Sequence, residues 1–136
     1  MQKSGDEALF AEAAAMRGRA YAPYSGFLVG AALLAKGGRV FLGCNVENAA
    51  FSPSNCAERT ALFAAVAAGE RQFSAIAIAG GKAGEPGSAP CLPCGVCLQA
   101  LLEFCDPQSF RVLTANGEGG LQAFLLGELL PHGFRL

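Results

Sequence analysis

Polar and charged residues at the two ends of the first segment predict a helix from Ser4 to Ala20. Ser4 is a residue type that caps helix N-termini, and Asp6 and Glu7 follow it, where negative charge suits the helix dipole. Arg17 and Arg19 stand near the other end, where positive charge is favourable. We therefore expect the chain to begin with a helix whose charges match its polarity.

The next apolar block predicts a hairpin of two strands. Residues Phe27–Ala35 are apolar at nearly every position, which is typical of a strand buried on both faces. The glycine-containing turn Lys36–Gly38 leads into a second strand, Arg39–Cys44. A loop is predicted from Asn45 to Asn55.

The rest of the chain alternates helices with strands. The predicted elements are a helix that begins at Cys56 and stops at Gly69, a strand Phe73–Ala79, a loop Gly80–Pro93, a helix Cys94–Phe104, strands Phe110–Thr114 and Leu121–Leu125, and a helical turn that reaches Leu130. This order predicts an α/β fold, a three-layer α/β/α sandwich with a mixed sheet of about five strands. We expect residues 1–136 to form a single domain.

Composition favours self-association and disfavours polyanionic partners. Only 15% of the 136 residues are charged and 52% are hydrophobic, whereas typical domains carry about 25% charged residues, so one small core cannot bury all the apolar surface. Ten Lys and Arg against eleven Asp and Glu leave no basic excess for a polymeric nucleic acid or an anionic membrane.

Targeting and redox signals point to the cytoplasm. The longest apolar stretches, residues 27–35 and 61–68, are shorter than the roughly 18 residues of a membrane span, and no signal-peptide pattern opens the sequence. Six cysteines in a cytoplasmic protein are expected to be reduced, which favours metal ligands or catalytic thiols over disulfides.

Three cysteines lie at the starts of two predicted helices. Cys56 opens one helix, and Cys94 and Cys97, three residues apart on one helix face, open another. Unpaired N–H groups and the helix dipole favour the thiolate form there, which is the form that binds metal. If the two helix starts converge, the three sulfur atoms can hold one Zn²⁺ per chain and leave a fourth, tetrahedral position for water.

Glu58 follows Cys56 by two residues and is the natural proton carrier of such a site. Zinc lowers the pKa of a bound water, and a nearby carboxylate can take the released proton and return it to a substrate nitrogen. A zinc-bound cysteine set with a non-ligand glutamate is the signature of zinc nucleobase deaminases.

The chain resembles the small homotetrameric cytidine deaminase family over nearly its whole length. The motifs that carry the resemblance are Tyr21-Ala22-Pro23-Tyr24-Ser25, residues 27–33, Gly43-Cys44-Asn45-Val46-Glu47-Asn48-Ala49, Cys56-Ala57-Glu58-Arg59-Thr60-Ala61, Pro93-Cys94-Gly95-Val96-Cys97 and Glu128-Leu129-Leu130-Pro131. Several motifs in one order are far more specific than a single Cys-x-x-Cys.

The resemblance implies a zinc-dependent hydrolase. Cys56, Cys94 and Cys97 would hold zinc, and Glu58 would carry protons to ring N3 and to the departing amine. Cytidine and deoxycytidine would become uridine and deoxyuridine plus ammonia, a reaction of pyrimidine salvage.

The resemblance also implies how the nucleoside is bound. Asn45 and Glu47 would hydrogen-bond the ribose, Phe27 would pack against the nucleoside, and Ala57 would belong to the substrate-binding set. Phe134 would reach into a neighbouring subunit, so that active sites are shared within a homotetramer.

Two positions depart from the family pattern. Leu98 stands between Cys97 and Gln99, where the family usually has Arg, so Arg59 alone would withdraw charge from the thiolates. We expect zinc affinity or zinc-water acidity to differ from that of a Leu98→Arg variant. Phe51 stands where the family often has Tyr, which removes a hydroxyl group.

Other readings of the cysteines are possible from spacing alone. Cys91, Cys94 and Cys97 could supply three ligands by themselves, or one Cys-x-x-Cys could be a redox pair or a structural zinc half-site. Cys91 could also close the fourth zinc position, but we interpret it as a spectator in a flexible loop. Cys44 and Cys105 are interpreted as small buried apolar residues.

Three alternative functions keep part of the pattern. The substrate could be a modified cytosine nucleoside or a nucleoside antibiotic, although Asn45 and Glu47 favour an ordinary ribose. The chain could be a structural zinc module in which Glu58 only stabilises the helix dipole. Editing of a nucleic acid is disfavoured by the near-neutral charge.

Overall fold

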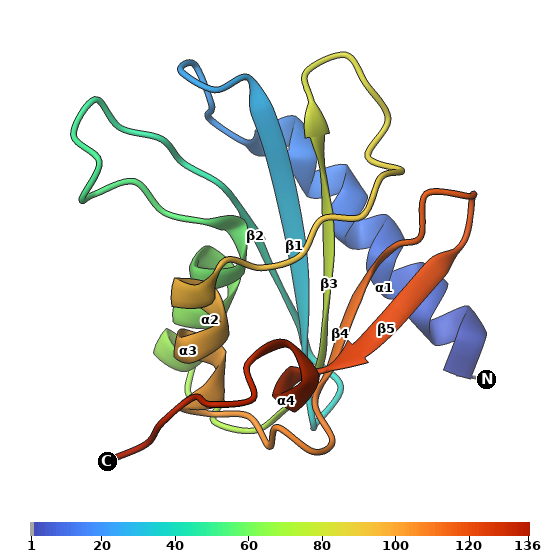
Figure 1. Ribbon diagram of the computed structural model, residues 1–136, viewed down its shortest axis with the longest axis vertical. Helices are drawn as coiled ribbons and strands as arrows, with labels where there is room; N and C mark the ends of the chain where they lie inside the picture. The colour runs from blue at the N-terminus through green and yellow to red at the C-terminus, as the bar shows by residue number, and fades with distance from the viewer. Residues whose placement is uncertain (1) are drawn as a thin grey trace.

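Five strands form one mixed sheet in the order β2-β1-β3-β4-β5 in the computed structural model, which describes residues 2–136 (Figure 1). The elements are α1 (Gln2–Met16), the 3₁₀ turn η1 (Arg17–Arg19), β1 (Phe27–Ala35), β2 (Val40–Cys44), α2 (Ala57–Ala67), β3 (Phe73–Lys82), α3 (Gly95–Leu102), β4 (Arg111–Ala115), β5 (Leu121–Leu125) and α4 (Leu126–Leu129). Within this sheet, as the structure describes it, β3 and β4 pair in parallel and the other three strand pairings are antiparallel. The prediction of a mixed sheet of about five strands is confirmed.

Helices cover both faces of the sheet, with α1 on one side and α2 and α3 on the other (Figure 1). Side chains of β3 alternate between these two layers: Ile76 and Ile78 pack in the core beneath α2 and α3, whereas Ala75, Ala77 and Ala79 face α1. The predicted three-layer α/β/α sandwich is confirmed, and both faces of its central strands are buried.

Two strand glycines allow the helices to lie directly on the sheet. A Cβ at Gly30 of β1 would lie 1.9 Å from the carbonyl oxygen of Ala13 in α1. A Cβ at Gly43 of β2 would lie 2.4 Å from the carbonyl oxygen of Ala57 and 2.5 Å from the nitrogen of Ala61. Gly43 therefore fixes how closely the first turn of α2 approaches the sheet.

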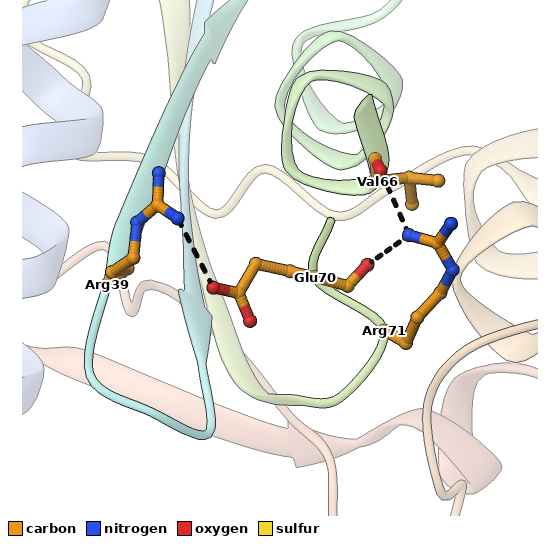
Figure 2. Close-up of polar contacts among 4 residues, drawn as sticks. All are labelled: Arg39, Val66, Glu70 and Arg71. Carbon is orange, nitrogen blue, oxygen red and sulfur yellow. Dashed lines mark hydrogen bonds and ion pairs between the residues drawn. The ribbon is translucent and has the colours of Figure 1, made fainter. Parts of the chain in front are cut away.

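The opposite end of α2 is tied down by two arginines (Figure 2). Arg71 Nη1 donates to the carbonyl oxygens of Val66 and Glu70, both at 2.9 Å, and so places a cation at the helix C-terminus. Arg39, next to the start of β2, lies 3.5 Å from the Glu70 carboxylate. The helix is thus held at both ends.

The first helix differs from its predicted bounds. It begins at Gln2, so Ser4 lies within it and is not its N-cap, and no acidic residue stands in its first turn. Gln and Lys are good helix formers, which explains the extension upstream. Asp6 instead forms an ion pair with Arg111 of β4, and the last predicted turn is the 3₁₀ segment η1.

The strand β3 runs three residues further than predicted, to Lys82. Its glycines suggested a loop, but Gly80 and Gly81 pair with Val29 and Leu28 of β1. A Cβ at Gly80 would lie 2.5 Å from Cys91 Sγ, so the missing side chain provides the space that the thiol fills. The helix predicted over Cys94–Phe104 is shorter than expected, because α3 spans Gly95–Leu102.

Candidate active site

Three thiols converge where α2 and α3 begin. Cys56 and Cys94 occupy the N-cap positions of the two helices, and neither side chain bonds its own helix's N–H groups. The Sγ atoms of Cys56, Cys94 and Cys97 all lie within 4.8 Å of one another, and those of Cys56 and Cys94 are 3.9 Å apart. The prediction that the two helix starts converge is confirmed.

This cluster fits a tetrahedral zinc ion. Sulfur atoms about 2.3 Å from a tetrahedral Zn²⁺ lie roughly 3.8 Å from one another, close to the observed Cys56–Cys94 separation. In the part of the chain that the structure describes, no fourth side chain joins the cluster. Three protein ligands with an open position are typical of catalytic zinc.

Arg59 supplies positive charge to the sulfur atoms. Its Nη2 lies 3.3 Å from Cys56 Sγ. Hydrogen bonds from Cys97 and Arg59 lower the pKa of Cys56 to about 5, which favours the thiolate. Position 98 of α3 offers no second cation, because it carries a leucine that packs in the core.

Glu58 lies in the first turn of α2 with only 5% of its surface exposed. Burial raises its pKa to about 7. A carboxyl group with a pKa near neutrality can both accept and donate a proton at physiological pH.

A pocket of about 420 Å³ opens beside the cluster. Its lining combines Cys56, Cys94 and Glu58 with residues of the β1 start and of the two loops that precede α2 and α3. Of the residues that the sequence predicted for the nucleoside, four line this pocket: Phe27, Asn45, Glu47 and Ala57. Phe134 does not line the pocket of its own chain.

The side chains of Asn45 and Glu47 form hydrogen bonds with the backbone around the pocket. Asn45 Oδ1 accepts the N–H of Val29 at 2.9 Å, and its Nδ2 donates to the carbonyl oxygen of Phe27 at 2.8 Å. Glu47 accepts hydrogen bonds from the backbone N–H groups of Tyr24 and Ser25 and from the Ser25 hydroxyl. The Ser25 hydroxyl is the largest cause of the lowered pKa of Glu47.

Cys91 forms a wall of the pocket and stands outside the three-thiol cluster. Its backbone N–H donates to Thr114 Oγ1 at 2.8 Å, and its Sγ fills the space above Gly80. Burial raises the pKa of its thiol to about 11, which keeps it neutral. The residue expected in a flexible loop is therefore anchored to β3 and β4.

Several lining residues could not be predicted from the sequence. Ser54 and Asn55 line the pocket immediately before Cys56, and Leu92 does so shortly before Cys94. Their place next to the cysteine motifs was the available signal, but loop side chains carry no periodicity that shows where they point.

Among the described residues, no helix has the length and apolar character that crossing a membrane requires.

The α/β sandwich, the three-sulfur cluster and the adjacent buried carboxyl group define a zinc-dependent hydrolytic enzyme. Residues 3–112 match the model of the cytidine and deoxycytidylate deaminase zinc-binding region. The chain belongs to this family.

Similar proteins agree with the family. A cytidine deaminase of Sporosarcina psychrophila is 46% identical over 94% of this chain and 90% of the relative, and one of Halalkalibacterium halodurans is 45% identical over 93% and 91%. The crystal structure of cytidine deaminase from Burkholderia pseudomallei has a TM-score of 0.83 at 48% identity and covers 94% of this chain and 98% of that one.

Proposed function

We propose that this protein hydrolyses cytidine and deoxycytidine to uridine and deoxyuridine with release of ammonia, a step of pyrimidine salvage. The observation that carries the proposal is a pocket lined by Cys56 and Cys94 of the three-thiol cluster, by the buried Glu58, and by Asn45 and Glu47. The similarity to proteins named cytidine deaminase supports the same substrate class.

The chain's own residues can move the protons of this reaction. Zinc held by Cys56, Cys94 and Cys97 supplies Lewis acidity that makes a water molecule a stronger acid and nucleophile. Glu58 accepts the proton that the attacking water loses and donates it to ring N3. It then takes the proton of the hydroxyl group formed on the ring carbon and passes it to the amine, which leaves as ammonia while that oxygen becomes a carbonyl oxygen. Its pKa of about 7 suits both directions of transfer.

The remaining lining residues orient the nucleoside. Glu47 and Asn45 offer carboxylate and amide oxygens to the ribose hydroxyls, since these oxygens retain lone pairs beyond their backbone hydrogen bonds. Phe27 and Ala57 border the space for the pyrimidine ring. Arg59 withdraws charge from Cys56, which keeps the three-thiolate site effective as a Lewis acid.

The first test measures cytidine loss by ultraviolet absorbance and ammonia release with the zinc-loaded protein. Glu58→Ala and Glu58→Gln are expected to reduce turnover at least 100-fold, about the contribution of general acid–base catalysis, with unchanged zinc content. If the wild type binds one zinc per chain and converts neither cytidine nor deoxycytidine, the substrate assignment fails. Modified cytosine nucleosides would be tested next.

We also propose a homotetramer in which active sites are shared between chains. Large apolar side chains exposed on the surface support self-association, and they include Phe51, Phe63, Val96 and Phe134. Because Phe134 does not line its own pocket, it would serve the pocket of another copy.

Mixed oligomers test the shared site. Glu58→Ala removes the proton carrier and Phe134→Ala removes the ring, so each variant alone is expected to be impaired. When the two chains are dissociated and reassembled together, some sites combine an intact Glu58 with an intact Phe134, and activity should rise above the sum of the two. No gain in mixtures whose mass confirms mixing would contradict the shared site.

The cytoplasm is the proposed location of this activity, in a single deaminase domain that spans residues 1–136. Three of the six cysteines form a cluster able to hold a metal ion, which supports a reducing compartment. The single sheet with a core on each face supports one domain.

A further inference from the structure

The C-terminal segment after α4 is pinned to α3 by side-chain hydrogen bonds. The amide of Gln99 contacts both backbone groups of Phe134: Nε2 donates to its carbonyl oxygen at 2.8 Å, and Oε1 accepts its N–H at 3.4 Å. Arg135 Nε donates to the carbonyl oxygen of Leu102 at 2.8 Å, and its Nη2 donates to that of Cys105 at 2.7 Å. Four hydrogen bonds thus hold the Phe134 backbone and the Arg135 side chain.

The ring that these contacts hold is not buried by its own chain. The Phe134 side chain is 65% exposed, although its backbone and its neighbour Arg135 are fixed. Fixing a terminal segment costs conformational entropy. An exposed aromatic ring offsets little of this free energy, because it buries little apolar surface. The arrangement is typical of a side chain that is presented to another molecule.

The ring does not line the pocket of its own chain. Helix α3 begins after Cys94, which lines the pocket, and Gln99 lies five residues further on, roughly 7.5 Å along the helix axis. In Figure 1 the C-terminal segment runs past α3 at the end of the molecule opposite the long loops after β2 and β3. The ring is therefore exposed outside its own pocket, and a pocket that it completes would belong to a second copy.

We propose that Gln99 and Arg135 are positioning residues. They fix the position and direction of the Phe134 side chain so that its ring closes the pocket of a neighbouring copy of this chain. This inference rests on the shared active site proposed above. Helix α3 then has two tasks, because it carries Cys97 for its own chain's metal cluster and Gln99 for the neighbour's substrate.

Loosening the segment should weaken nucleoside binding more than it slows the chemical step. The ring would have to be ordered each time substrate binds, which reduces affinity, whereas Glu58 and the thiols are unchanged. Losing one net hydrogen bond corresponds to roughly a 5- to 10-fold rise in KM.

The experiment uses the full zinc-loaded chain and compares Gln99→Met, Arg135→Met, Phe134→Ala and the double variant Gln99→Met with Phe134→Ala. Gln72→Met is the matched control, since this exposed glutamine lies outside the pocket and α3. Gln99→Met and Arg135→Met are expected to raise KM for cytidine 5- to 10-fold. The value of kcat should change less than about twofold, with unchanged zinc content and oligomer mass.

Non-additivity distinguishes positioning from a general structural effect. In the Phe134→Ala background, Gln99→Met should raise KM no further, because the ring it positions is gone. An equal rise in both backgrounds would overturn the inference. Arg135→Met leaves the sequence of α3 intact, so the inference is still tested if Gln99→Met disturbs the metal cluster.

The two proposals fail in distinguishable ways. If Phe134→Ala leaves KM unchanged, the shared site fails and the positioning role fails with it. If Phe134→Ala raises KM while Gln99→Met and Arg135→Met do not, only the positioning role is wrong.

Discussion

Two carboxyl groups of one pocket have pKa values that their surroundings move in opposite directions. Burial raises the pKa of Glu58 to about 7, whereas hydrogen bonds from Ser25 and Tyr24 lower that of Glu47. At neutral pH, Glu47 is therefore a fixed anion that accepts hydrogen bonds, and Glu58 can exchange protons. Environment, more than residue type, separates the two roles.

Glu47 should also contribute stability that depends on pH. Its folded pKa lies below its ordinary value of 4.5, so its contribution is present above that pH and is lost as the pH falls through the lower folded value. Glu47→Gln is expected to reduce the free energy of unfolding near neutrality, and the difference from wild type should vanish in acid. Urea denaturation over a pH series measures this difference, and a constant difference at every pH would contradict it.

At the residue scale, the sequence was informative wherever chemistry depends on spacing. Cys56, Cys94, Cys97 and Glu58 are recognisable because metal ligands and a proton carrier need fixed separations on helix starts. The burial of Glu58 and the contact of Cys91 with Gly80 were not predictable, because both depend on segments distant in the sequence.

At the scale of elements, β2 determines where α2 places the metal site. Gly43→Ala is expected to push the first turn of α2 away from the sheet, since the new Cβ would meet backbone atoms of Ala57 and Ala61. The expected loss is about 1–3 kcal/mol in the free energy of unfolding, together with weaker zinc binding.

Two other glycines provide the comparison. Gly30→Ala makes a similar clash with α1 and should destabilise the fold with little effect on zinc affinity. Gly5→Ala meets no atom within 4 Å and should slightly stabilise α1. Denaturation measures the free energy of unfolding, and competitive titration measures zinc affinity. Equal zinc affinities for Gly43→Ala and Gly30→Ala would argue against a link between the β2–α2 contact and the metal site.

The pattern of apolar residues predicted the type and order of the elements better than their ends. The alternation in β3 follows directly from its Ile and Ala residues. The 3₁₀ turn after α1 and the extension of β3 to Lys82 depend on contacts with β1, which local preferences do not report.

At the scale of the whole molecule, the three thiols join two helices that follow different strands. Zinc bound there would link α2 to α3, so its removal should destabilise the fold as well as abolish activity. A chelator is expected to lower Tm by about 5–15 °C, and added zinc should restore it.

Two cysteine variants test whether the three-thiol cluster causes the fall in Tm on chelation. Cys56→Ser should already have a low Tm that the chelator does not change, whereas Cys91→Ser should respond like wild type because Cys91 lies outside the cluster. Chelation that removes zinc without lowering the Tm of the wild type would show that the metal does not link the helices.

Three layers and a mixed sheet were predictable from the order of the elements, but the strand order β2-β1-β3-β4-β5 was not. Which strands pair, and whether they run parallel, is decided by long-range packing. The antiparallel β1–β3 and parallel β3–β4 pairings place β3 at the centre, where both layers cover it.

The charge of the pocket restricts which form of the substrate can enter it. Glu47 is anionic at neutral pH, and the one cation among the lining residues, Arg59, is bonded to Cys56. A phosphorylated nucleoside would bring about two further negative charges without a partner for them. Cytidine monophosphate is therefore expected to be a poor substrate in the same assay, so a phosphatase must act on a nucleotide before this protein can deaminate its base.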